Sequence, residues 1–165
     1  MTRRDPLREP LAIGALELEH RLFMAPMAGL TTAPFRRSVR RWGAGLVHTE
    51  MIAAMGVVYG NRRTLDYLAC GEDEHPVGFQ LFGAAPDALA RAAEACVAVG
   101  ADLVDLNMAC PVRKVVKTGA GAALLGAPDA AEAAVRAVIA AVPAHVPVTV
   151  KIRAGLREGD EAGRR

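Results

Sequence analysis

One cysteine stands where a buried strand is expected to end. In the stretch DLNMACPVRK, residues 105–114, Cys110 follows a short apolar run and precedes Pro111, which has no N–H for a strand ladder. A thiol there can act as a nucleophile, or as a general acid that delivers a proton to carbon. The alternative is an inert core cysteine, because free cysteine is among the most buried residue types. Cys96, inside an alanine-rich helical pattern, fits that packing role, and Cys70 lies in a loop.

Three other polar side chains occupy comparable positions. Asn107 and Gln80 carry amides, which donate and accept hydrogen bonds and suit a planar imide or a base edge, although each could equally be a satisfied strand-end residue. Lys151 lies inside an apolar strand pattern, where an unpaired ammonium is costly. We expect Lys151 to meet an anionic ligand or a buried partner. An ion pair with Glu50 or Asp105 is the structural alternative.

Short strands alternate with helices along the chain. Apolar, often β-branched runs predict strands at residues 22–25, 46–51, 77–82, 103–107 and 146–152. Helical patterns, bounded by proline and glycine, occupy residues 34–42, 86–99 and 129–142. The first of these helices places Phe35, Val39 and Trp42 on one face. This alternation implies parallel strands joined by right-handed crossovers.

A (β/α)₈ TIM barrel and a doubly wound sheet both fit that alternation. The barrel is favoured because polar residues follow the strand ends, where a barrel gathers its catalytic loops. A Rossmann sheet would need a glycine-rich turn after its first strand, whereas residues 25–34 contain no G-x-G-x-x-G. A closed barrel needs eight strands and roughly 250 residues. We therefore expect residues 1–165 to form the N-terminal part of an incomplete barrel, with about the first five strands.

Composition limits the possible classes of protein. The chain is 52% hydrophobic and 23% charged, which is typical of a globular domain. Three cysteines without a C-x-x-C pair indicate neither a disulfide framework nor a zinc site, and we predict no metal. The N-terminus lacks the apolar run of a signal peptide, and no segment approaches the roughly 20 apolar residues that span a bilayer. We expect a soluble, cytoplasmic protein with no membrane partner.

Positive charge is grouped although the net charge is only +2. The first group, Arg36, Arg37, Arg40 and Arg41, is interpreted as the solvated face of a helix. Further groups are Arg62 with Arg63, and Arg113 with Lys114 and Lys117. The last group follows Cys110 and could contact RNA phosphates, with a solvated loop as the alternative.

Six stretches resemble the successive motifs of the tRNA-dihydrouridine synthase family. They are APMAGLTTAPFR (25–36), HTEM (48–51), FQLFG (79–83), DLNMACPVRKV (105–115), GAGAALL (119–125) and VTVKIRAG (148–155). One such motif would be a weak signal, whereas six in this order are highly specific.

The resemblance implies an FMN-dependent oxidoreductase that uses NADPH, or NADH, to reduce the C5–C6 double bond of a uracil in tRNA. It implies a helical, tRNA-binding C-terminal domain, which we expect to be absent here together with the closing strands. It also assigns roles: flavin contacts to Pro26, Met27, Ala28, Gln80 and Lys151, a uracil contact to Asn107, and the catalytic acid to Cys110.

The sequence departs from the family pattern in two ways. Ala109 stands where glycine is commoner, and the family's later histidine and its phosphate-binding loops have no counterparts in residues 1–165. We therefore predict that this piece alone binds FMN weakly or not at all. Two other functions remain open: an FMN barrel oxidoreductase that acts on a small molecule, and a non-catalytic, truncated RNA-binding fragment.

Overall fold

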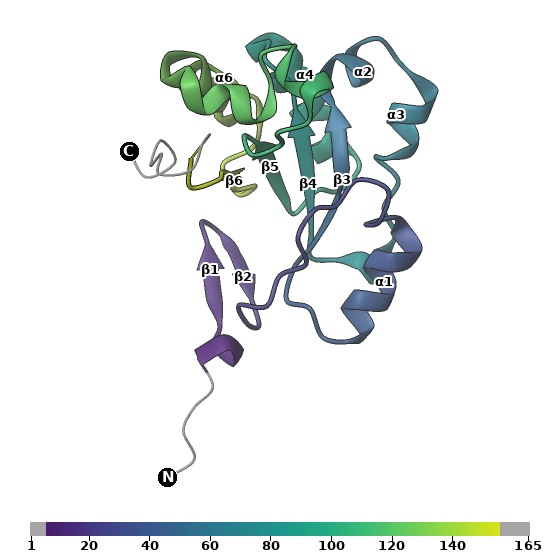
Figure 1. Ribbon diagram of the computed structural model, residues 1–165. Coiled ribbons are helices and arrows are strands. Elements are labelled where there is room, and N and C mark those ends of the chain that lie inside the picture. The colour runs from purple at the N-terminus through teal and green to yellow at the C-terminus, as the bar shows by residue number, and fades with distance from the viewer. Residues whose placement is uncertain (1–5, 156–165) are drawn as a thin grey trace.

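The structure, a computed structural model, describes residues 6–155 and is built on a four-stranded parallel sheet (Figure 1). The strands lie in sequence order: β3 (Val47–Ala53), β4 (Val77–Phe82), β5 (Leu103–Asn107) and β6 (Val148–Lys151). The helices are α1 (Ala33–Arg41), α2 (Ala54–Val58), α3 (Arg62–Asp66), α4 (Pro86–Ala98), α5 (Arg113–Val116) and α6 (Pro128–Ala141). Parallel neighbours joined by helical crossovers are the arrangement of a (β/α)₈ barrel, so the predicted class is confirmed for this part of a barrel.

The three predicted helices are confirmed to within one residue at each end. Helices α1, α4 and α6 each have a proline in the first turn, where a missing N–H is harmless and the fixed φ favours a helix. After α1 and α4 the chain turns at Gly43 and Gly100, whose φ values of 88° and 95° favour glycine. No helix among residues 6–155 is long and apolar enough to cross a bilayer.

The strand predictions hold for four of the five runs. The first run, residues 22–25, is not a regular strand, because its only pairing within residues 6–155 is a single parallel bridge. This bridge joins Phe23 to Leu46, the residue before β3. The Met24 N–H donates to the Leu46 carbonyl at 2.9 Å, and Pro26, which has no N–H, follows two residues later. The predicted first strand is therefore corrected to a bridge that delivers the chain to the loop at residues 26–31.

A β-hairpin that the apolar pattern did not predict precedes this bridge. Its strands are β1 (Leu11–Ile13) and β2 (Leu16–Leu18), with Gly14 in the turn at a φ of 58°. Leu18 packs against Leu46 and Leu103 at the starting ends of the sheet strands, and the hairpin lies below those ends in Figure 1. Each strand has three residues, too few for an alternating pattern to stand out.

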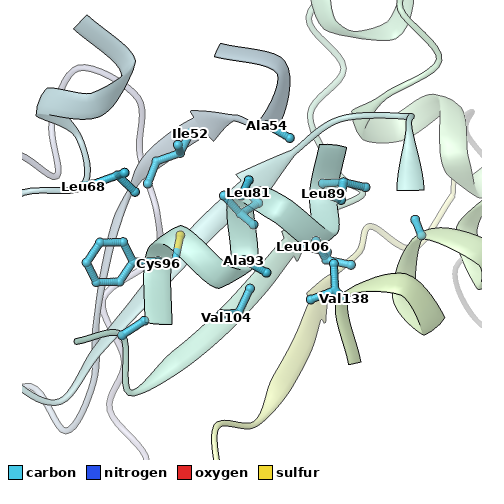
Figure 2. Packing of buried hydrophobic residues seen from close by; sticks show 14 of the residues in the cluster. Ile52, Ala54, Leu68, Leu81, Leu89, Ala93, Cys96, Val104, Leu106 and Val138 are labelled. Carbon is cyan, nitrogen blue, oxygen red and sulfur yellow. The ribbon is translucent and has the colours of Figure 1, made fainter. Parts of the chain in front are cut away.

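Strand residues alternate between two faces of the sheet. Phe79 and Leu81 of β4 belong to the main hydrophobic cluster, and so do Val104 and Leu106 of β5. Figure 2 shows Leu89, Ala93 and Cys96 of α4 packed against this outer face. The intervening positions turn to the barrel interior, where Gln80, Asp105 and Asn107 are buried.

The buried side chain of α1 is not one of the three apolar residues that share a helical face. Arg36 is only 3% exposed, whereas Trp42 is 89% and Phe35 42% exposed; Val39 alone packs against the core. The reading of Arg36 as part of a solvated face is therefore wrong. Its buried partner, Glu74 of the short 3-10 helix η2 (Glu72–Glu74), supplies the compensating charge.

Candidate active site

The barrel interior opens into a cavity of about 340 Å³ between the bridge segment and β6. Its lining is mixed: apolar residues of the hairpin and the strand starts, and polar residues further along the strands. Those that matter for chemistry are Pro26, His48, Asp105, Thr149 and Lys151. Two loops stand at the carboxyl ends of the strands beside this cavity, and we name them the first loop (residues 26–31) and the cysteine loop (residues 108–111).

The first loop is fixed by hydrogen bonds to its backbone. The Met27 N–H donates to Thr31 Oγ1 at 3.2 Å, and that hydroxyl donates back to the Met27 carbonyl at 3.1 Å. The Gly29 N–H donates to Glu50 Oε1 at 2.6 Å, the short distance expected when the acceptor is ionised. Gly29 has a φ of 77°, which a residue with a Cβ rarely adopts.

A bulge in β3 accompanies this contact with Glu50. The pairing of β3 with β4 shifts between His48 and Met51, and Thr49 fills the break: its Oγ1 accepts from the Gln80 N–H at 3.1 Å. Such bulges re-aim the side chains that follow. Here the next side chain, Glu50, reaches the first loop.

His48 holds the segment that leads into the first loop. Its Nδ1 lies 2.9 Å from the Met24 carbonyl, which only accepts, so Nδ1 carries the proton. Burial lowers the pKa of His48 from its ordinary 6.5, opposed by the Met24 hydrogen bond and the charge of Asp105. The ring has room because residue 78 is glycine; a Cβ there would lie 2.7 Å from His48 Cδ2. His48 is therefore a neutral hydrogen-bond donor near pH 7.

The buried ion pair of Arg36 also supports the first loop. Arg36 Nε donates to Glu74 Oε2 at 2.5 Å, and its Nη1 donates to the Thr31 carbonyl at 2.8 Å. Nη2 donates to the Ala69 carbonyl at 2.9 Å. Glu74 Oε1 accepts from the Gly71 N–H at 3.1 Å. Both charges thus have several partners, as a buried pair requires.

The cysteine loop is held by side-chain amides. Gln80 Nε2 donates to Asp105 Oδ2 at 2.6 Å, and Asn107 Nδ2 donates to Gln80 Oε1 at 2.9 Å. Asn107 Oδ1 accepts the N–H groups of Ala109 and Cys110, at 3.2 and 2.9 Å. An unbroken chain of hydrogen bonds therefore joins three predicted site residues, Gln80, Asn107 and Cys110, to a buried carboxylate.

The GAGAALL stretch packs against the other side of Cys110. The Cys110 carbonyl accepts the Ala122 N–H at 2.9 Å. A Cβ at Gly121 would lie 2.7 Å from the Cys110 carbonyl oxygen, and Gly121 has a φ of 61°. Only glycine fits this close approach without a shift of the loop. Cys110 is half-buried, and hydrogen bonds from its N–H and to its carbonyl hold the backbone that carries the thiol.

A second cysteine, Cys70, lies beside a histidine and an aspartate, as a catalytic cysteine can, but its pKa is raised rather than lowered. Cys70 Sγ lies 3.8 Å from His75 Nε2, and His75 Nδ1 lies 2.6 Å from Asp102 Oδ2. Burial, followed by the charge of Glu74, raises the pKa of Cys70 to about 11. This thiol is therefore protonated near neutral pH, and it lies in the segment that precedes β4, not at the carboxyl end of that strand.

The predicted flavin contacts differ in their surroundings. Pro26 and Lys151 both line the cavity, whereas Met27 and Ala28, the next residues of the first loop, are exposed and do not line it. Lys151 is exposed and pairs in register with Asn107, but the structure gives its ammonium no ion pair within residues 6–155. Gln80 is 0% exposed, so a direct contact with a flavin would require its side chain to move.

The structural alternative for Lys151, an ion pair with Glu50 or Asp105, is not found in the described part of the chain. Glu50 accepts from Gly29, and Asp105 accepts from Gln80 and from Thr149 Oγ1 at 2.7 Å. Asp105 and Thr149 were missed as site residues. The strand period of two could have found them, because each lies two positions before a predicted site residue, Asn107 or Lys151, on the same face.

Basic side chains follow the cysteine loop directly. Arg113 and Lys114 of α5, and Lys117 just after it, are exposed. Helix α5 has only four residues, and it turns the chain from Cys110 toward the GAGAALL stretch. A positive surface therefore adjoins the half-buried thiol.

Comparison with known proteins gives the same family along most of the chain. The family described as "Dihydrouridine synthase (Dus)" matches residues 23–163. "Probable tRNA-dihydrouridine synthase 1" of Synechocystis sp. is 44% identical over 130 residues, 78% of this chain and 36% of that protein. "tRNA-dihydrouridine synthase B" of Pseudomonas aeruginosa is 45% identical over 114 residues, 68% of this chain and 34% of that protein. This chain thus spans about a third of the length of these relatives.

Solved structures support the fold. 6-Hydroxypseudooxynicotine amine oxidase from Pseudomonas geniculata N1 superimposes with a TM-score of 0.71 over 98% of this chain and 36% of its own, at 17% identity. Histamine dehydrogenase from Rhizobium sp. 4-9 gives 0.66 over 94% of this chain and 33% of its own, at 16% identity. Likeness at such low identity shows the barrel fold alone. The stronger sequence matches confirm the family predicted from the six motifs, and this chain belongs to the dihydrouridine synthase family.

Proposed function

We propose that this chain carries part of the active site of a tRNA-dihydrouridine synthase, an oxidoreductase that reduces the C5–C6 double bond of a uracil in tRNA with FMN and NADPH or NADH. The observation that supports it best is the linked set of Gln80, Asn107 and Cys110 at the carboxyl ends of β4 and β5. Relatives with 44–45% identity bear that enzyme's name.

The cavity suits a flavin on one side. Pro26 offers an apolar wall, the exposed Met27 and Ala28 follow it in the first loop, and the exposed Lys151 ammonium lacks an ion-pair partner among residues 6–155. When bound, FMN supplies the hydride that is added to C6 of the uracil, and it regains a hydride from the nicotinamide. Lys151 would stabilise negative charge on the ring.

Cys110 would provide the proton for C5. Its thiol proton passes to carbon as the hydride arrives at C6, so the uracil gains two hydrogens and the sulfur recovers a proton from solvent. Carbon protonation needs an acid at a fixed place, and the Asn107 and Ala122 hydrogen bonds fix the Cys110 backbone. Asn107 would contact the uracil from the same strand end.

The tRNA would meet the positive surface beside Cys110. Arg113, Lys114 and Lys117 are exposed, and phosphates are the first partners of such side chains. The uracil must leave the base stack to reach the thiol, as in other enzymes that act on a base. A cytoplasmic location follows in this proposal from the substrate and the nicotinamide.

We further propose that residues 1–165 form the N-terminal part of the barrel domain. In this proposal β6 pairs with a further strand, and the closing strands carry the FMN phosphate site. Retention of FMN by this chain alone should accordingly be weak. A helical tRNA-binding domain would complete the enzyme.

The test joins residues 1–155 to the C-terminal remainder of the Pseudomonas aeruginosa relative. We expect the chimera to retain FMN and to form dihydrouridine in unmodified tRNA with NADPH. Cys110→Ala should lower that rate by about 10²-fold or more, with the flavin spectrum unchanged. Cys96→Ala is the matched control, since Cys96 is a buried residue of α4 outside the two loops. Unchanged dihydrouridine formation in Cys110→Ala, or reduction of a free small molecule without tRNA, would contradict the proposal.

A further inference from the structure

We propose that Asp105 is a positioning residue that sets the direction of the side-chain hydrogen bonds linking β4, β5 and the cysteine loop, and thereby makes Asn107 a donor only. The inference rests on the proposed function, in which Asn107 faces the uracil and Cys110 supplies the proton. Asp105 itself is 4% exposed and lines the barrel interior.

The argument begins with the two oxygens of Asp105. Oδ2 accepts from Gln80 Nε2 at 2.6 Å, and Oδ1 accepts from Thr149 Oγ1 at 2.7 Å. A carboxylate that accepts at both oxygens offers no donor. The Gln80 amide must therefore turn its NH₂ toward Asp105, which leaves its oxygen facing β5.

The same logic passes along the chain of amides. Because Gln80 Oε1 faces Asn107, the Asn107 amide must turn its NH₂ toward Gln80, and Nδ2 lies 2.9 Å from Oε1. Asn107 Oδ1 then faces the cysteine loop. The loop ends the chain with two backbone donors, the N–H groups of Ala109 and Cys110. An acceptor at one end and donors at the other thus require one orientation of both amides.

This orientation decides what Asn107 can offer to a ligand. Both lone pairs of its Oδ1 are occupied by backbone N–H groups, so its remaining capacity is one hydrogen of Nδ2. The sequence alone left Asn107 able to donate and accept. In the structure it can donate only, and it therefore suits a ring carbonyl such as uracil O4, and opposes the exocyclic amine that cytosine carries at the same position.

The first readout is the alkylation rate of Cys110 by iodoacetamide in the purified 165-residue chain, measured by mass spectrometry of the Cys110 peptide. Asp105→Leu removes the acceptor, so the cysteine loop should loosen and the rate should rise roughly fivefold, as loss of a net hydrogen bond implies. Thr149→Val is the matched control. It removes the hydrogen bond between Thr149 and Asp105 but leaves the Gln80 and Asn107 amides in the same orientation. The alkylation rate should therefore stay within about twofold of the original.

The second test reverses the direction and does not depend on Asp105→Leu folding. In Asn107→Asp, Gln80 lies between two carboxylates, and its oxygen must face one of them, so the loop should loosen by a similar factor. Adding Asp105→Asn lets the Gln80 amide turn around: its NH₂ meets the new carboxylate, and its oxygen meets the new amide. Thr149 can still donate to position 105. The double variant should therefore return to within about twofold of the original rate.

These outcomes separate a directed chain from simple packing. Recovery in the double variant, with Thr149→Val unchanged, supports the proposal. A double variant no slower in alkylation than Asn107→Asp, or a Thr149→Val chain that reacts as fast as Asp105→Leu, would overturn it. Neither readout needs FMN, NADPH or tRNA, so the role of Asp105 can be rejected independently of the proposed function. The chimera tests that function separately, by dihydrouridine formation.

Discussion

The first loop and the cysteine loop stand at the same end of the sheet but are held in different ways. The first loop is held by charge: Glu50 binds the Gly29 N–H, and the buried Arg36 of α1 binds the Thr31 carbonyl. The cysteine loop is held by neutral amides, and its one charge, Asp105, lies three hydrogen bonds away from the Cys110 N–H.

The difference suits what each loop presents. Hydrogen bonds to charged groups contribute about 1.5–3 kcal/mol, and neutral ones about 0.5–1.5 kcal/mol. The first loop offers a wall of backbone and apolar side chains, for which strength is enough. The cysteine loop presents a reacting thiol, and its backbone is held through amides whose hydrogen bonds have a fixed direction. We therefore expect the first loop to be destabilised most by substitutions that remove a charge. The cysteine loop should be destabilised most by substitutions that disturb the direction of its amide hydrogen bonds.

The largest effect should come from the ion pair under the first loop. Glu74→Ala leaves the Arg36 guanidinium buried without its counter-charge, so the free energy of unfolding should fall by about 3–5 kcal/mol. Urea denaturation measures it. Glu72→Ala, an exposed glutamate of the same 3-10 helix, is the control and should change little. A loss below about 1 kcal/mol for Glu74→Ala would mean that the pair does not support the fold.

A smaller effect is expected at the direct contact of Glu50. Glu50→Ala removes the ionised acceptor of the Gly29 N–H, and stability should fall by about 1.5–3 kcal/mol. Glu50→Gln keeps an acceptor and should lose less than Glu50→Ala. The measurement is again urea denaturation. Equal losses in the two variants would show that shape, rather than the hydrogen bond, is what matters.

Thr31 tests the internal bonds of the first loop. Thr31→Val removes the hydroxyl that accepts from the Met27 N–H and donates to its carbonyl, so a loss of about 1 kcal/mol is expected. Thr31→Ser keeps the hydroxyl and should lie closer to the original protein. Thermal unfolding compares the two. If both variants lose the same amount, the hydroxyl is not the anchor.

The smallest effect is a pH dependence that belongs to the first loop's side of the site. Burial lowers the pKa of His48 below 6.5, so the unfolded chain takes up the proton first as pH falls. This contribution to stability is complete above pH 6.5 and is lost as pH falls from there through the lowered pKa. The Tm of His48→Gln should therefore depend less on pH below 6.5. Parallel Tm profiles for the two proteins would contradict this assignment.

The helices and the strand-end position of the site residues could be predicted from the sequence, because both depend on local patterns. Helix ends marked by proline and glycine, and the common level of Gln80, Asn107 and Cys110, follow from spacing and from parallel strands. The burial of Arg36 could not be predicted, since its partner Glu74 lies 38 positions away and nothing local marks the pair. The direction of the amides also needed the structure, because a sequence does not say which group each amide faces.

The most direct test of the contrast is hydrogen–deuterium exchange of residues 26–31 and 108–111 in Glu50→Ala and Asp105→Leu, side by side. If the two loops are held independently, exchange should become faster in the first loop for Glu50→Ala and in the cysteine loop for Asp105→Leu. The other loop should be unchanged in each variant. Faster exchange of both loops in either variant, or of neither, would contradict it.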